Sequence, residues 1–189
     1  MDVTKKKKKL REMMEKLQKE LDPEYCSKAS ETICQKVIDL PEYRQADTIF
    51  CFVGMKDKGE PQTKAIIEDA LKQGKKVAVP LCIDKTTMNA IEIQDYESDL
   101  VPGFYGILEP IDGSQVIEPS KIDFVVVPCV TCDHAGHRLG HGNGYYDRYL
   151  SQGDMKTAMI CFEKLTVANG AIPTEDHDLV IDQVITDAE

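Results

Sequence analysis

The sequence predicts an α/β fold in which helices flank a mainly parallel sheet, and two observations support this. Segments whose apolar residues recur at helical spacing alternate with short, continuous apolar runs rich in β-branched residues. Such runs are typical of parallel strands that are buried on both faces. The 189-residue chain contains no internal repeat, low-complexity tract or domain-sized linker, so we expect one domain over residues 1–189.

Two amphipathic helices are predicted near the N-terminus. The first begins near Thr4 and carries an apolar face formed by Leu10, Met13, Met14, Leu17 and Leu21. The second begins at Asp22, an N-cap residue followed by proline at the first helical position. We expect it to end before Pro41, because the residue that precedes a proline disfavours helical geometry.

The rest of the chain supplies the expected strands and two further helices. Strands are predicted at "TIFCFVG" (48–54), "KKVAVPLCI" (75–83), "NAIEIQ" (89–94), "DFVVVP" (123–128), "TAMICF" (157–162) and "DQVIT" (182–186). The strand at 89–94 alternates apolar and polar residues, which places it nearer an edge. Helices are predicted at 63–73, closed by Gly74, and at 144–152.

Composition limits the classes of partner. The net charge of −10 and the pI near 4.9 argue against nucleic acid or an anionic membrane as the main partner. No apolar run approaches the roughly 20 residues that span a bilayer, and the N-terminal lysines precede no secretory apolar stretch. The seven cysteines are scattered through apolar segments, which predicts reduced thiols in a cytoplasmic protein.

The segment "RLGHGNGYYDRYL" (138–150) is the strongest candidate for a binding loop. Its three alternate glycines lack β-carbons, so backbone N–H groups can approach an anion closely. Arg138 offers a fork for phosphate oxygens, and Asp147 offers the hard oxygen ligand that magnesium prefers. The segment fits neither standard nucleotide fingerprint, so composition leaves a tight structural turn as the alternative to a phosphate site.

Two other features admit competing interpretations. Potential zinc ligands gather between residues 129 and 141, namely Cys129, Cys132, His134, His137 and His141. They lie too close together for a zinc finger, so we expect buried thiols and unrelated loop histidines, with a zinc-stabilised interaction module as the alternative. The lysine run at 5–9 is a solvated helix face or a contact for an anionic ligand, and Glu60 is a surface residue or a ligand contact.

These segments together resemble the 5-formyltetrahydrofolate cyclo-ligase (methenyltetrahydrofolate synthetase) family. The family signature is an aspartate-led strand followed by P-x-x-x-x-D-x-x-G-x-R-L-G-x-G-x-G-Y-Y-D-x-x-L, and residues 123–150 match every fixed position. Further matches are "KKKLR" (7–11), "EPQT" (60–63), "GILEP" (106–110) and "IPTEDHDLVIDQVIT" (172–186). The resemblance therefore covers nearly the full chain. Cys129 and Cys132 depart from it, since relatives more often carry glycine and an aromatic residue there.

The resemblance implies a fold, a reaction and a setting. The fold is the Rossmann-like arrangement shared with sugar-phosphate isomerases and CoA-transferases. The reaction converts 5-formyltetrahydrofolate to 5,10-methenyltetrahydrofolate while ATP is split to ADP and phosphate, with Mg²⁺. The formyl oxygen takes the γ-phosphoryl group, N10 of the folate attacks the activated carbon, and phosphate leaves. We expect a cytoplasmic monomer whose partners are these two small molecules, with a catalytically silent folate- and ATP-binding relative as an alternative.

The resemblance also implies roles for individual residues. The expected ATP contacts are Lys7, Lys8, Lys9, Leu10, Arg11, Arg138, Leu139, Gly140, His141, Gly142, Asn143, Gly144, Tyr145 and Tyr146. The expected folate contacts are Val53, Glu60, Tyr145 and Tyr146. Asp147 and Asp178 are the expected metal ligands, and Arg138 and Asp147 are the expected catalytic residues.

Overall fold

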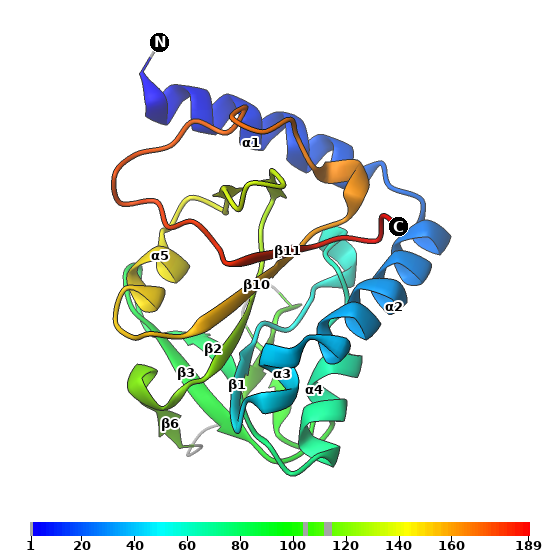
Figure 1. The fold of residues 1–189 in the computed structure, drawn as a ribbon, viewed down its shortest axis with the longest axis vertical. Coiled ribbons are helices and arrows are strands. Elements are labelled where there is room, and N and C mark those ends of the chain that lie inside the picture. Colours follow the sequence, from blue (N-terminus) through cyan, green and yellow to red (C-terminus); the bar gives the residue numbers. More distant parts are fainter. Residues whose placement is uncertain (1, 104–105, 112–114) are drawn as a thin grey trace.

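A large, mainly parallel sheet lies at the centre of the molecule (Figure 1). The structure is a computed structural model and describes residues 2–103, 106–111 and 115–189. In the described residues the sheet has the order β11-β10-β7-β1-β2-β3-β6. Its strands are β1 (Thr48–Cys51), β2 (Lys76–Cys82), β3 (Met88–Ile93), β6 (Val116–Ile117), β7 (Phe124–Val127), β10 (Lys156–Ile160) and β11 (Gln183–Ile185). This architecture confirms the predicted α/β class.

The pairing of the strands follows from their connections. β11, β10, β7, β1 and β2 pair in parallel, whereas β2–β3 and β3–β6 pair antiparallel. Parallel neighbours need a crossover, and α4 (Lys64–Lys72) supplies it between β1 and β2. β2 and β3 need only the short turn at 83–87. As predicted, the alternating strand β3 lies near an edge of the sheet, while β1 and β7 are buried throughout.

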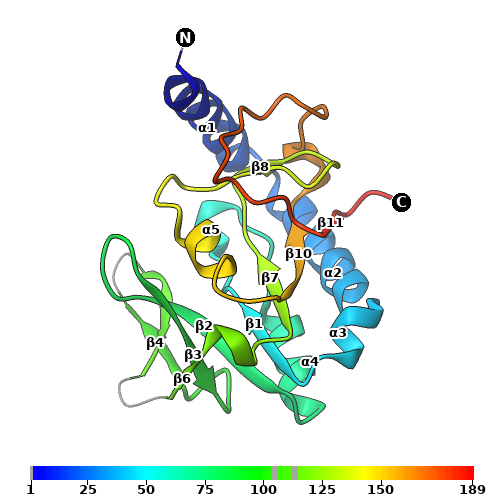
Figure 2. The same cartoon turned by 60° about the vertical axis from the view of Figure 1, so that its left-hand side comes forward.

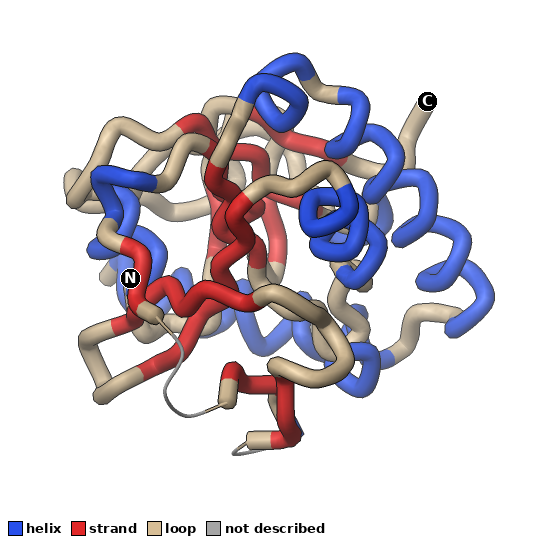
Figure 3. Tube along the Cα trace, turned by 90° about the horizontal axis from the view of Figure 1, so that it is seen from below, coloured by secondary structure: helices blue, strands red, loops and turns tan. Residues whose placement is uncertain are grey.

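Helices cover both faces of the sheet (Figures 2 and 3). The elements are α2 (Pro23–Asp39), α3 (Pro41–Gln45) and α4 on one face, and α5 (Tyr145–Leu150) on the other. Tyr43 of α3 packs edge-on against Phe124 of β7, whereas Phe50 of β1 contacts Tyr146 and Tyr149 near α5. Successive strand residues face opposite sides, so these contacts place α3 and α5 on opposite faces.

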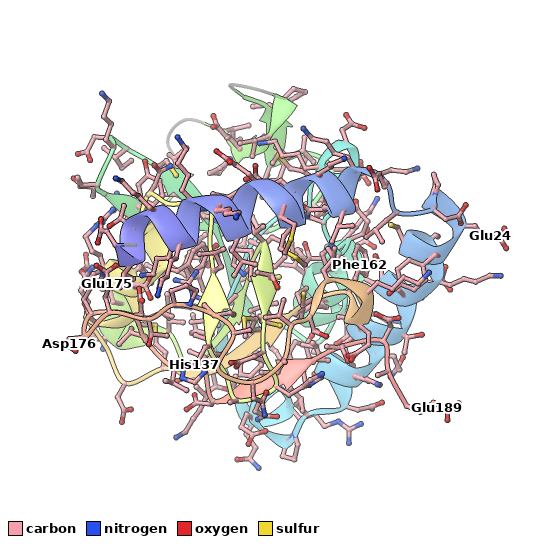
Figure 4. All side chains as sticks on the ribbon, turned by 90° about the horizontal axis from the view of Figure 1, so that it is seen from above. Glu24, His137, Phe162, Glu175, Asp176 and Glu189 are labelled. Carbon is pink, nitrogen blue, oxygen red and sulfur yellow. The ribbon has the colours of Figure 1, made fainter. Side chains whose placement is uncertain are left out.

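Helix α1 (Val3–Lys19) crosses the loops at the carboxyl end of the sheet (Figures 1 and 4). The predicted apolar face is wrong for Met13 and Leu17, which are 52% and 42% exposed. Met14 of the predicted face is buried, as is Gln18, which the prediction did not include. Leu10 and Leu21 of that face are partly buried against the core. α1 packs on loops rather than on a sheet, so its inner stripe is narrow, and its N-terminal part is polar.

The second helix has the predicted start. The Asp22 side chain accepts a hydrogen bond from the backbone N–H of Tyr25 at 2.9 Å, and Pro23 occupies the first helical position. The helix ends at Asp39, and Pro41 begins the short helix α3, which the sequence did not predict. Among the described residues, no helix is both long enough and apolar enough to cross a bilayer.

Among the described residues, four short strands lie outside the main sheet. β4 (Leu100–Pro102) pairs with β5 (Leu108–Pro110), and β8 (Thr131–Cys132) pairs with β9 (Arg138–Leu139). The β8–β9 hairpin, which the sequence did not predict, stands between β7 and the glycine loop. Short 3₁₀ turns lie at Lys56–Lys58, Pro119–Lys121 and Glu163–Leu165.

Candidate active site

One pocket of about 760 Å³ gathers most of the residues that the sequence singled out. Its walls come from α1, from the loop between β9 and α5, from the first turns of α5, and from residues 175–179. Figure 4 shows Glu175 and Asp176 beside the N-terminal half of α1, which crosses above them. The predicted site residues on the lining are Lys7, Lys8, Arg11, Arg138, Leu139, Gly140, His141, Gly142, Asn143, Gly144, Tyr145, Tyr146, Asp147 and Asp178.

Helix α1 contributes two anchored cations to the pocket. Lys7 Nζ lies 2.8 Å from Glu175 Oε2 and 2.5 Å from Asp178 Oδ2. Burial lowers the pKa of Lys7, but the hydrogen bonds to the two carboxylates outweigh it and leave the pKa raised. Arg11 Nε donates to the backbone oxygen of Gly140 at 2.7 Å. α1 is thereby tied to both the glycine loop and the 175–178 segment.

Lys9 and Leu10, which the resemblance included among the ATP contacts, lie outside the lining of this pocket. Helical geometry explains the difference, since each residue turns the helix by about 100°. Lys7 and Arg11 share one face, and Lys9 projects from the opposite face into solvent. Leu10 is half-buried and packs toward the core.

Arg138 and Asp147 form a nearly buried ion pair in the pocket. The Arg138 side chain is 6% exposed, and its Nη2 donates to Asp147 Oδ2 at 2.7 Å. Oδ1 of the same carboxylate accepts a hydrogen bond from the backbone N–H of Leu179 at 3.2 Å. Arg138 Nε is buried and has no hydrogen-bond partner among the described residues. An unpaired buried donor is costly, so this atom suits a ligand oxygen.

The glycine loop has the backbone geometry that the sequence predicted. Gly142 and Gly144 have φ of +102° and +66°, which side chains with a β-carbon rarely adopt. A β-carbon on Gly142 would also lie 3.4 Å from Arg11 Cζ. Arg148, which the sequence reading did not select, holds the loop by donating to the backbone oxygens of Asn143 at 2.6 Å and Thr86 at 2.9 Å.

The two tyrosines of the loop differ in their surroundings. Tyr145 donates its hydroxyl to the backbone oxygen of Asp84 at 2.6 Å, so it ties α5 to the β2–β3 turn. Tyr146 stacks on Phe50 at 6.1 Å between ring centroids, and the Arg138 guanidinium lies 5.8 Å from its ring. Burial raises the pKa of Tyr146. Both rings line the pocket, where the flat rings offer apolar surface.

Glu60 and Val53 lie outside the pocket lining, and Glu60 lies beside His141 of the glycine loop. The Glu60 side chain is buried, which excludes the interpretation as a surface residue. Its Oε2 accepts from the Met55 N–H at 2.8 Å, and its Oε1 lies 3.7 Å from His141 Nε2. Burial raises the pKa of Glu60 and lowers the pKa of His141. Val53 is 8% exposed at the end of β1. Glu60 thus joins the pocket through His141.

The predicted metal ligands both line the pocket, and each has a cationic partner. Asp147 pairs with Arg138, and Asp178 pairs with Lys7. Burial raises the pKa of Asp178, but hydrogen bonds from Lys7 and from the Glu175 N–H outweigh it and hold the pKa below its usual value. Glu175, His177 and Asp178 place ligand atoms within 4.8 Å of one another. Sequence reasoning missed Glu175, although it lies within the segment that matched the family.

The structure does not assemble the five residues of the zinc alternative. His134 Nε2 lies 3.1 Å from Glu163, and His137 Nδ1 lies 3.0 Å from Asp133. The third histidine of the set, His141, lies beside Glu60 as described above. Cys129 and Cys132 are joined instead by Cys161, a cysteine that the sequence did not connect with them.

Comparisons with known proteins identify the family of the chain. A model of the 5-formyltetrahydrofolate cyclo-ligase family matches residues 3–187. The chain is 31% identical to a probable 5-formyltetrahydrofolate cyclo-ligase of Schizosaccharomyces pombe, with 82% of each chain covered. It is 27% identical to the 5-formyltetrahydrofolate cyclo-ligase of Escherichia coli K12, with 92% of this chain and 96% of the relative covered.

Solved structures show the same fold. The 5,10-methenyltetrahydrofolate synthetase of Aquifex aeolicus superposes with a TM-score of 0.83 at 25% identity, over 97% of this chain and 90% of that one. A 5,10-methenyltetrahydrofolate synthetase from Mycoplasma pneumoniae superposes over the full length of both chains with a TM-score of 0.77 at 23% identity. The family model spans almost the entire chain, and the loop that carries the family signature lines the pocket; the chain belongs to the 5-formyltetrahydrofolate cyclo-ligase family.

Proposed function

We propose that this chain cyclises 5-formyltetrahydrofolate to 5,10-methenyltetrahydrofolate and splits ATP to ADP and phosphate in doing so. The observation that carries the proposal is the pocket in which the glycine loop meets the Arg138–Asp147 pair and the Lys7–Asp178 pair. The cyclo-ligase names of the relatives identify the reaction. The presence of both ion pairs argues against a catalytically silent relative.

In this proposal the ATP phosphates lie against the glycine loop and α1. The N–H groups between Gly140 and Gly144 approach the phosphate oxygens, because Gly142 and Gly144 leave the backbone uncovered. Arg138 donates its unpaired Nε to a phosphate oxygen. Lys7 and Arg11, on one face of α1, approach from the opposite wall, and the more exposed Lys8 adds a weaker contact.

The folate lies on the side of the loop that faces Glu60 and Val53. The carboxylate of Glu60 has one oxygen engaged by the Met55 N–H and the other facing His141. That second oxygen can accept hydrogen bonds from the amino-pyrimidinone edge of the pterin. Tyr145 and Tyr146 line the junction between the two substrates. His141 then lies between the phosphate loop and the pterin contact.

The residues of the pocket fit Mg²⁺. Magnesium prefers oxygen ligands and usually takes one or two protein carboxylates, and Asp147 and Asp178 both line the pocket. The bound ion would supply neutralisation of the charge that develops on the transferred phosphoryl group. Lys7 pairs with Asp178 and Arg138 pairs with Asp147, which orients both carboxylates. Both cations also reach the space that phosphates would occupy.

The chemistry requires positioning rather than an enzyme nucleophile. The formyl oxygen attacks the γ-phosphorus and ADP leaves, so that a poor leaving group becomes a phosphate ester. N10 then attacks the activated carbon, gives up its proton, and phosphate departs as the ring closes. Arg138 and Lys7 stabilise the charge on the phosphoryl oxygens, and the rigid loop holds the two substrates in line.

We also propose that residues 1–189 form one domain that acts as a monomer in the cytoplasm. The buried cluster that links α1, the sheet and α2 supports the assignment of one domain. The net charge of −10 and the free cysteines are in keeping with a protein of the cytoplasm.

One assay tests the proposed function. The purified chain is mixed with 5-formyltetrahydrofolate, ATP and Mg²⁺, and the absorbance of methenyltetrahydrofolate is followed together with ADP release. We expect equimolar formation of the two products, and neither in the absence of ATP or folate. Binding of both ligands without turnover would instead identify a silent relative.

A further inference from the structure

Three cysteine thiols lie close together in the protein interior, at and next to the β8–β9 hairpin that carries Arg138. Cys129 follows β7, Cys132 lies in β8, and Cys161 follows β10. Their sulfur atoms all lie within 4.8 Å of one another, and the three residues are 6%, 0% and 2% exposed. We call these residues the thiol cluster. It lies outside the described lining of the active-site pocket.

The spacing of the sulfur atoms suits a metal ion. In a trigonal site with metal–sulfur bonds of about 2.3 Å, the sulfur atoms stand about 4 Å apart. The observed upper limit of 4.8 Å is within one ångström of that value. The ligands come from three separate segments of the chain, each fixed by the sheet or by the hairpin, so only small side-chain adjustments are needed. Soft thiolate ligands select thiophilic cations over the Mg²⁺ expected in the neighbouring pocket.

The surroundings argue against a redox role for the same thiols. Contact with the Cys129 thiol and burial raise the pKa of the Cys132 thiol. Reactive cysteines are instead exposed and have lowered pKa values. A metal ion does not require an exposed thiolate, because it displaces the thiol protons as it binds.

A buried metal–thiolate site also requires that its negative charge be compensated. Three thiolates and a divalent ion carry a net charge of −1, which needs a nearby cation in the interior. Cys132 is the cross-strand partner of Arg138 in the β8–β9 hairpin, so the cluster lies beside the segment that carries this nearly buried guanidinium, which also pairs with Asp147.

We propose that Cys129, Cys132 and Cys161 form a binding site for one thiophilic d¹⁰ cation of the zinc and copper(I) class. Such an ion joins β8 to the ends of β7 and β10. Since β8 pairs with β9, the bound ion also restrains the strand that presents Arg138. The measurement of binding is independent of the proposed ligase activity.

Cadmium titration tests the site. The probe is Cd²⁺ alone, added under reducing conditions to the full chain, with the ultraviolet absorbance of cadmium–thiolate bonds as the readout. Because burial slows entry, a second sample is refolded from denaturant in the presence of Cd²⁺. We expect one tightly bound ion per chain and a raised Tm on binding. Absence of the absorbance from both samples, with the chain folded, would overturn the proposal.

Matched variants assign the ligands. Loss of even an outer-shell partner costs 10- to 100-fold in metal affinity, so Cys132→Ala and Cys161→Ala should each weaken Cd²⁺ binding by about 100-fold or more. Cys51→Ala is the control, since Cys51 is equally buried but lies outside the cluster. Equal losses in all three variants would refute the assignment. If one cluster variant fails to fold, the ligand assignment is tested by the other variant and by the number of Cd²⁺ ions bound per wild-type chain.

Discussion

Replacing Asp147 with asparagine separates the catalytic contribution of this carboxylate from its contribution to stability. The substitution keeps the shape and volume of the side chain and removes its charge. In the structure Asp147 accepts from Arg138 Nη2 at 2.7 Å and from the Leu179 N–H at 3.2 Å. Asparagine has only one acceptor oxygen, so one of these two donors then faces an amide NH₂ group.

The expected loss of stability follows from these contacts. A hydrogen bond to a charged group contributes about 1.5–3 kcal/mol, and the Arg138 side chain is 6% exposed, so solvent screens the pair only slightly. For a domain of this size, 1 kcal/mol corresponds to about 2–4 °C in Tm. We therefore expect Asp147→Asn to lower the Tm by roughly 3–12 °C and to remain folded at 25 °C, as measured by calorimetry.

The same substitution should also lower the catalytic rate. If Asp147 holds the ion that neutralises the transferred phosphoryl group, its loss should lower kcat on the order of 100-fold, and raised magnesium should restore part of it. The assay is the formation of methenyltetrahydrofolate at several magnesium concentrations.

A matched variant separates the two effects. Asp123 accepts from the Asp47 N–H at 3.0 Å and the Thr48 N–H at 2.9 Å, away from the pocket. Asp123→Asn should therefore lower the Tm while the rate stays near that of the wild type. Normal turnover of Asp147→Asn at low magnesium, or an equal rate loss in Asp123→Asn, would refute the reasoning.

Three further substitutions, with Lys9→Ala as a control, test the remaining contacts. Arg138→Lys keeps the charge but loses the fork, so kcat/KM should fall at least 10-fold, and added magnesium should not restore it. Lys7→Ala should raise the KM for ATP about 10-fold and leave the KM for folate nearly unchanged. Lys9 is exposed, so Lys9→Ala should change neither KM value. If the two variants change the KM for ATP equally, the lysine run is only a solvated helix face. Glu60→Gln should weaken folate binding by about 1.5–3 kcal/mol and leave nucleotide binding unchanged. Burial raises the pKa of Glu60, so the folded chain retains the Glu60 proton to higher pH than the unfolded chain does. The stability of the wild type should therefore fall as the pH rises above the ordinary glutamate range. Denaturant titrations of Glu60→Gln should not show that fall.

Local sequence patterns were sufficient for most of the fold. The continuous apolar runs at β1 and β7 predicted strands buried on both faces, and the alternation at β3 predicted a strand near the edge. The three-residue strand β11 was predicted, but the two-residue strands β6, β8 and β9 escaped prediction, because strands this short show no period. The predicted face of α1 was wrong at Met13 and Leu17, because the side that faces the protein also includes the polar residues Lys7 and Arg11, which no hydrophobic pattern can mark.

Residue types alone marked only the local part of the candidate site. Gly142, Gly144, Arg138 and Asp147 lie within one short segment, which residue types favoured as a phosphate loop or a tight structural turn, whereas the distant residues were expected only from the family resemblance. Sequence could not show that Lys7 pairs with Asp178, because 171 residues separate them. The same limit applies to Cys161, which joins Cys129 and Cys132 only through the neighbouring positions of β7 and β10 in the sheet.

The long-range ion pairs bear on how a chain with a net charge of −10 can bind a polyanion. Lys7 and Arg138 each pair with carboxylates in the pocket, so these pairs contribute little net positive charge. ATP phosphates would add several negative charges to such a site, and a cation bound with them would offset that charge. In the proposed reaction Mg²⁺ would supply it, because the ion would take oxygen ligands from Asp147 and Asp178 while Lys7 and Arg138 would turn to the phosphates. On this proposal the metal and the nucleotide bind jointly rather than singly.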